Sequence, residues 1–162
     1  MAEPETDFAP LLPVGVHTLT VDQLRDLCVL PFPTSLRRRR LMSRLEAIVR
    51  KLEAEHVRGY FWIDGSFLTD KIEPNDVDVV LVVNSSFLDN ATTAQQLLIS
   101  WVASNLKETL SCDSYFIREY PVSHRWYYDG EESKLNWLKQ FGNSRVGTIK
   151  GIAAIELKGG PN

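Results

Sequence analysis

Two aspartates, Asp76 and Asp78, flank a single valine at the start of a run of β-branched residues. Alternate residues of a β-strand share a face, so both carboxylates are expected on one side of the strand. Carboxylates placed in this way repel each other, and a divalent cation removes the repulsion. Mg²⁺ (or Mn²⁺) suits the pair because it takes oxygen ligands and leaves coordination positions for substrate phosphates. The pair therefore predicts metal-dependent phosphoryl or nucleotidyl transfer.

A third acid, Asp113, begins the apolar stretch 113–117, which is expected to be a neighbouring strand. Three carboxylates hold two metal ions better than two carboxylates do, so Asp113 is the candidate that completes the metal site with Asp76 and Asp78. An aspartate at the start of a strand is also common as a plain turn residue, and both interpretations stay open.

Gly65 and Ser66 precede the aspartate pair and are expected to form a tight turn between a strand and a short helical segment. Glycine allows a ligand to approach the backbone closely. A helix that starts there would direct its free N–H groups and positive dipole toward a triphosphate. Gly65 and Ser66 are therefore predicted to bind the phosphates of a nucleotide.

Three cations, Lys71, Arg145 and Lys150, are candidates to neutralise the charge of that triphosphate. Each is alternatively an ordinary surface cation. The run Arg37–Arg40 forms a basic helical surface, which is either solvated or in contact with RNA or an acidic partner.

The elements that must position these residues follow from hydrophobic periodicity. Strands alternate with helices, which predicts an α/β (α+β) fold with a mixed sheet of about four strands covered by helices. Residues 1–15 are expected to be an extended arm, because Pro4, Pro10 and Pro13 disfavour helix, and residues 16–162 to be a single domain. Strands are expected at 60–63, 77–83, 113–117 and 152–157, and helices at 24–29, 35–55, 92–108 and 131–141.

Bulk properties exclude several other classes of protein. The chain has 162 residues, 44% hydrophobic and 24% charged, with a formal net charge of -3, which argues against wholesale electrostatic binding of nucleic acid. Two cysteines without motif spacing favour a reducing compartment over a disulfide scaffold. Without a signal-peptide pattern or a long apolar run, a cytoplasmic protein with no membrane association is expected.

The string Asp64-Gly65-Ser66 followed by Asp76-Val77-Asp78 resembles the signature of the DNA polymerase β-like nucleotidyltransferase superfamily. Within it, the chain looks similar to a family of short bacterial proteins over most of its length, from about residue 13. The resemblance implies a palm-like sheet, metal binding by Asp76, Asp78 and Asp113, and phosphate binding by Gly65 and Ser66. Asp64 stands where the superfamily usually has a hydrophobic residue, and it either repels a triphosphate or caps the turn.

The expected function is thus a minimal nucleotidyltransferase. It would transfer NMP from an NTP, ATP being the first choice, to a hydroxyl on a protein or RNA, with two-metal catalysis. Because the chain has little room for an acceptor-recognition domain, a partner protein or a second copy is expected to help. Short proteins that the chain resembles act in toxin–antitoxin or phage-defence pairs. The alternative is an inactive nucleotide- or RNA-binding module with the same fold.

Overall fold

The computed structural model describes residues 8–141 and 150–159, which form a five-stranded mixed sheet with helices on both faces. The strands lie in the order β1-β5-β2-β3-β4. β1 pairs with β5, and β3 with β4, in parallel, whereas β2 is antiparallel to both β5 and β3. The strands are β1 (Gly15–Thr18), β2 (Arg58–Asp64), β3 (Val77–Asn84), β4 (Cys112–Glu119) and β5 (Gly151–Lys158).

The prediction of an α/β (α+β) fold is confirmed, but the expected number of about four strands was too low. The additional strand, β1, is four residues long and begins at Gly15, the last residue of the segment expected to be an extended arm. It has no alternating pattern to detect, and it becomes a strand by pairing with β5 at the far end of the chain.

Six α-helices and one 3-10 helix connect the strands among the described residues. The predicted helix at 92–108 is two helices, because Asn105 takes a left-handed conformation (φ 68°) between them. The helices are α1 (Val21–Cys28), α2 (Leu36–Ala54), α3 (Ser85–Asp89), α4 (Thr93–Ala103), α5 (Lys107–Leu110), α6 (Tyr127–Phe141) and the 3-10 helix η1 (Ser66–Leu68).

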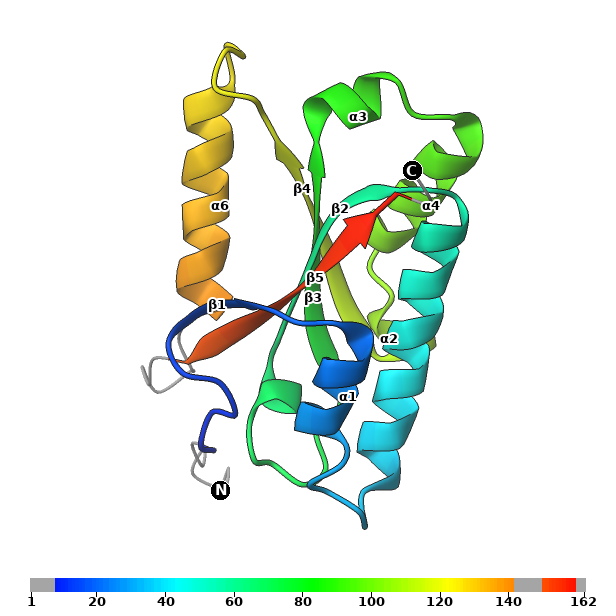
Figure 1. Cartoon of the computed structure of the whole chain (residues 1–162), viewed down its shortest axis with the longest axis vertical. Helices are drawn as coiled ribbons and strands as arrows, with labels where there is room; N and C mark the ends of the chain where they lie inside the picture. Colours follow the sequence, from blue (N-terminus) through cyan, green and yellow to red (C-terminus); the bar gives the residue numbers. More distant parts are fainter. Residues whose placement is uncertain (1–7, 142–149, 160–162) are drawn as a thin grey trace.

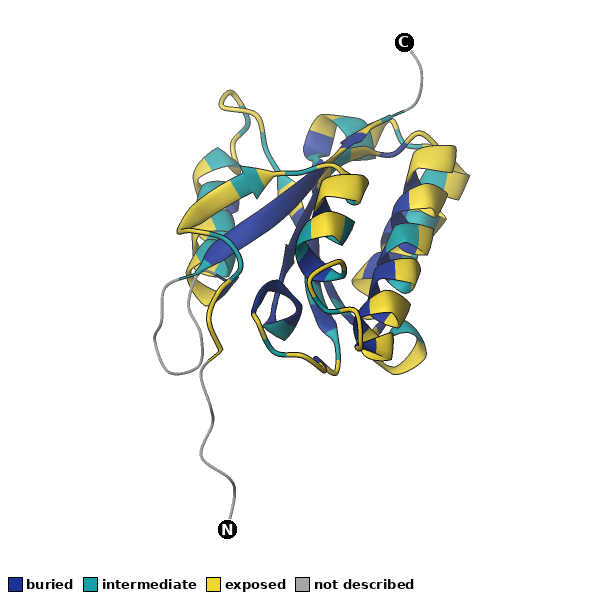
Figure 2. Ribbon diagram, turned by 60° about the horizontal axis from the view of Figure 1, so that its bottom comes forward, coloured by how far each residue is buried: buried dark blue, intermediate teal, exposed yellow. Residues whose placement is uncertain are grey.

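The sheet separates two apolar layers. Figure 1 shows α6 alone on one side of the sheet, with α1, α2 and α4 on the other. The larger core fills the side of α1, α2 and α4, where Val79 and Leu81 of β3 meet Leu45 and Ile48 of α2. Val80 of β3 points to the opposite side, into a smaller cluster with residues of α6. Consequently the central strands are buried on both faces (Figure 2).

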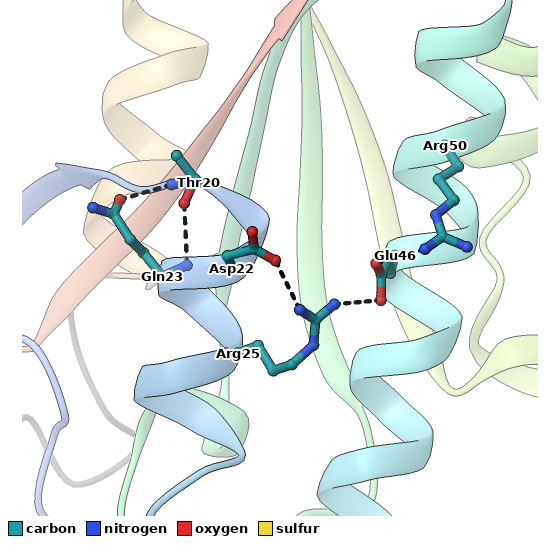
Figure 3. A network of polar contacts seen from close by, with 6 residues as sticks. All are labelled: Thr20, Asp22, Gln23, Arg25, Glu46 and Arg50. Carbon is teal, nitrogen blue, oxygen red and sulfur yellow. Dashed lines mark hydrogen bonds and ion pairs between the residues drawn. The ribbon is translucent and has the colours of Figure 1, made fainter.

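Capping and a charged network fix α1 against α2. Thr20 and Gln23 form a reciprocal capping box at the start of α1, with hydrogen bonds of 3.1 and 2.9 Å. Arg25 lies between Asp22 and Glu46, at 2.8 and 2.6 Å, and so ties α1 to the middle of α2 (Figure 3). These contacts hold α1 against α2, the helix that carries a buried basic residue described below.

The segment before β1 lies along the turn that follows β2. Leu11 donates its backbone N–H to Leu68 O at 2.9 Å, and Asp70 donates to Ala9 O at the same distance. The segment Ala9–Leu11 thus lies against the Gly65–Asp70 turn. Within residues 8–141 and 150–159, no helix has the length and apolar character needed to cross a membrane.

Candidate active site

Three aspartates lie side by side across the central strands. Asp78 of β3 is in register with Asp113 of β4 on one side and with Asp64 of β2 on the other. All three share the sheet face of Val80, which is the α6 side, because alternate residues of a strand point the same way. Asp76 comes two residues before Asp78, at the entrance to β3. The structure therefore brings together the three acids predicted as metal ligands and adds Asp64.

The pKa of Asp78 is raised in this group of acids. Burial, together with the negative charges of Asp76 and Asp113, raises the pKa of the Asp78 carboxyl to about 6. Lys150 and Lys107 oppose the shift but do not cancel it. Without a cation, the site thus holds more negative charge than its lysines balance.

Gly65 packs directly against Asp78. Its backbone has φ +85° and ψ −167°, a conformation open almost only to glycine. A Cβ atom at this position would lie 2.7 Å from Asp78 Oδ2, so the carboxylate fits only because the side chain is missing. The turn and the aspartate pair, which are separate in sequence, are one structural unit.

Ser66 opens the 3-10 helix η1, directly after Gly65. The helix has three residues, so its dipole is small, and close backbone approach at Gly65 is the stronger feature of the turn. The predicted short helical segment after Gly65 and Ser66 is confirmed.

A buried arginine, Arg38 of α2, holds this turn in place. Its guanidinium donates to the backbone carbonyls of Phe67 at 2.8 Å, Thr69 at 2.5 Å and Lys71 at 3.0 Å, and to Cys28 O at 2.9 Å. The side chain is fully buried, and burial lowers its pKa. One planar fork with five N–H donors satisfies carbonyls from two segments, which a lysine cannot do.

The four arginines of the run Arg37–Arg40 differ in burial, because only Arg38 is buried. Arg37 reaches Asn75 Oδ1 at 2.7 Å and so contacts the loop before β3, whereas Arg39 and Arg40 are exposed. Neither of the two interpretations of this run included a buried, structural arginine. Arg38 lies three residues before Leu41, in phase with the apolar face of α2, so the helical period is the signal that could have identified it as buried.

Two residues at the junction of α4 and α5 complete the site, and sequence analysis did not predict either of them. Asn105, in its left-handed conformation, donates Nδ2–H to Asp113 Oδ1 at 2.6 Å. Lys107 Nζ lies 3.6 Å from Asp76 Oδ2, with over half of its side chain exposed. The connection from β3 to β4 thus returns to the carboxylates that the two strands carry.

Asp64 and Lys150 form a buried ion pair beside Asp78. Asp64 is 1% exposed, the Lys150 side chain is 11% exposed, and Nζ lies 3.3 Å from Asp64 Oδ1. Oδ1 has no hydrogen bond of good geometry with any described residue, so the contact is chiefly electrostatic. Burial raises the pKa of Asp64 to about 7, against the opposing effect of Lys150.

Of the other two predicted phosphate-binding cations, Lys71 does not join this group. The ammonium of Lys71 lies over the ring of Phe8, 5.6 Å from its centroid, and its backbone carbonyl accepts from Arg38. Arg145 lies outside the described residues. Among the predicted cations, the structure therefore places Lys150 at the carboxylates.

Aromatic side chains border the site on the α6 side. Tyr115, two residues after Asp113 on β4, packs against Trp137 of α6 with ring centroids 4.7 Å apart, and Trp137 meets Phe141 edge-on at 5.7 Å. Burial and the hydrogen bond with Asp113 raise the pKa of Tyr115. This apolar wall lowers the local dielectric, which strengthens the interactions of the carboxylates.

The donor chemistry of the site fits a hard divalent cation. All of the candidate ligands are carboxylate oxygens, and like-charge repulsion raises the pKa of Asp78, a penalty that a cation removes. The part of the chain that the structure describes contains no preassembled group of three or more His, Cys, Asp or Glu side chains around one point. Asp76 and Asp113 instead contact Lys107 and Asn105.

Comparison with known proteins gives one match. A family model described as "Family of unknown function (DUF6932)" matches residues 4–156, nearly the whole chain. No curated protein and no solved structure matches the sequence.

Proposed function

The chain belongs to DUF6932, a family of unknown function, and we propose that it is a metal-dependent nucleotidyltransferase of the DNA polymerase β-like type. One observation carries the proposal: Gly65 packs against Asp78, which is in register with Asp113. A turn suited to phosphates and a set of carboxylates suited to Mg²⁺ therefore meet at one end of the sheet. The palm-like sheet implied by the sequence resemblance is part of the same proposal.

In this proposal Asp76, Asp78 and Asp113 hold Mg²⁺, or Mn²⁺, which neutralises the phosphate oxygens of a bound NTP when present. The backbone at Gly65 and the hydroxyl of Ser66 contact the phosphate chain. Asp113, paired with Asn105 at 2.6 Å, also orients and helps deprotonate the acceptor hydroxyl. The acceptor oxygen then bonds to the α-phosphorus as the bond to pyrophosphate breaks, so that NMP is transferred.

ATP is the first candidate donor, and the acceptor is a hydroxyl of a protein or RNA. No separate acceptor-binding domain is found in the described residues, so a partner protein or second copy would supply that surface. The exposed arginines Arg39 and Arg40 of α2 offer one contact for an acidic partner.

Nucleotide binding tests the proposal most directly. Titration of the full chain with each of the four NTPs, with and without Mg²⁺, should give saturable, metal-dependent binding of at least one. Asp76→Ala combined with Asp78→Ala should abolish it, while the exposed pair Asp26→Ala with Asp89→Ala, which removes the same charge, should not. Absence of binding by all four NTPs with metal present would refute the proposal.

A catalytically inactive binding module is the second candidate, and one observation favours it. Lys107 and Asn105 already engage Asp76 and Asp113, as in a site that no longer needs a metal. Incubation with NTPs labelled at the α-phosphate and a cellular extract separates the two. Labelled protein or RNA supports the enzyme, and NTP binding without any labelled product supports the module.

A further inference from the structure

Asp64 differs from Asp76, the other acid of the site with a lysine partner, because its ion pair is buried: the Asp76–Lys107 side chains are 27% and 58% exposed, those of Asp64–Lys150 1% and 11%. It is the last residue of β2, 1% exposed, and in register with Asp78. Lys150 directly precedes β5, and its ammonium lies 3.3 Å from Asp64 Oδ1. A second buried carboxylate next to Asp78 adds to the negative charge of the site, and the ammonium of Lys150 offsets that charge.

We propose that Asp64 is a positioning residue that holds the Lys150 ammonium beside Asp78, where it contacts the phosphate chain of a bound nucleoside triphosphate. The inference rests on the proposed function and deepens it. It also gives a reason for the carboxylate at a position where the related superfamily usually has a hydrophobic side chain.

The geometry of the ion pair suits this role. A charge-assisted N–H···O contact of full strength is about 2.7–2.9 Å long, and the separation of 3.3 Å is longer, with no hydrogen bond of good geometry to Oδ1 from the described residues. An ammonium has three N–H donors, so a loose contact with Asp64 leaves donors for phosphate oxygens. Lys150 can therefore contact a ligand while it stays beside Asp64.

Burial separates Lys150 from the other lysines near the turn. Its side chain is 11% exposed, whereas that of Lys107 is 58% exposed and the ammonium of Lys71 lies over Phe8. A cation fixed in a water-poor site acts on phosphate more strongly than a solvated one, because little reorganisation is needed when the ligand arrives. Among the three lysines compared, Lys150 is therefore the one placed to bind an anionic ligand with little reorganisation.

Calorimetric titration with MgATP and with adenosine tests the inference. Lys150→Met should weaken MgATP binding about tenfold to a hundredfold, the value of one charge-assisted contact, and leave adenosine binding unchanged. Lys158→Met is the matched control, since Lys158 is exposed at the other end of β5. Lys150→Arg keeps the charge and should retain most of the affinity, which guards against loss of fold as the cause.

Asp64→Asn distinguishes a positioning role from simple repulsion of phosphate. It should weaken MgATP binding in the wild-type background but have no further effect when Lys150 is already Met, because Asp64 acts through the lysine. Tighter binding by Asp64→Asn, or equal losses in both backgrounds, would overturn the inference. If the wild type binds MgATP and Lys150→Met binds it equally well, this inference fails alone; if the wild type binds no NTP, the proposed function fails with it.

Discussion

Replacement of Arg38 by Met should destabilise the protein far more than the same replacement of a neighbouring arginine. The guanidinium donates to four backbone carbonyls at 2.5–3.0 Å, among them Cys28 O, Phe67 O and Thr69 O. A hydrogen bond to a charged group contributes about 1.5–3 kcal/mol net of desolvation. Because the four bonds share one guanidinium they do not add independently, and we expect a loss of about 3 kcal/mol.

Urea unfolding followed by circular dichroism measures this loss. For a chain of this size, about 3 kcal/mol corresponds to a fall of about 6–12 °C in Tm. Arg40→Met is the matched control, because Arg40 is exposed on the same helix, and it should change the free energy of unfolding by less than about 0.5 kcal/mol. Arg38→Lys should lie between the two, since an ammonium cannot reach all four carbonyls. Equal stabilities of Arg38→Met and Arg40→Met would refute the assignment of Arg38 as the anchor of the turn.

Three further predictions concern the site and the core. Gly65→Ala should lower the free energy of unfolding by about 1–3 kcal/mol, because φ is +85° and the new Cβ would meet Asp78 Oδ2. In a double-mutant cycle, Asp78→Ala should recover part of this loss of stability, and additive losses would contradict the close approach. The pKa of Asp78 is raised from 3.8 to about 6 in the folded protein, so in EDTA the free energy of unfolding should fall as pH rises from about 4 through 6. Asp78→Asn lacks this loss and should be more stable than the wild type by about 3 kcal/mol at pH 8, whereas parallel pH curves would show that the shift is absent. Burial raises the pKa of the Cys28 and Cys112 thiols to about 12, so neither should react with Ellman's reagent until urea unfolds the protein. Rapid reaction of either thiol in the folded protein would mean that its segment opens locally.

Much of the fold was predictable because its central elements have strong local patterns. The helix α2 carries an apolar face with a serine cap at Ser35, and β3 is a continuous β-branched run that is buried on both sides. Both were predicted to within two residues. By contrast, β1 and the left-handed Asn105 depend on partners distant in sequence or on one backbone angle, and neither leaves a periodic pattern.

The candidate site divides in the same way. Asp76 and Asp78 follow from strand periodicity alone, and the parallel register of β4 brings Asp113 beside them. The partners of these acids, Asn105 and Lys107, come from a turn whose path the sequence does not specify. Arg38 is in phase with the apolar face of α2, but its residue type is one expected in solvent, and the carbonyls that it binds lie in a turn about 30 residues away in sequence.

The position of β5 has a consequence for how the protein is made. β5 is synthesised after the other four described strands, yet it lies inside the sheet, between β1 and β2. Until it leaves the ribosome, β1 has no partner and one edge of β2 is open, so a nascent chain exposes two unpaired strand edges. A truncation before Gly151 would therefore divide the sheet and release the N-terminal strand, whereas loss of residues after Gly159 would leave every strand pair intact.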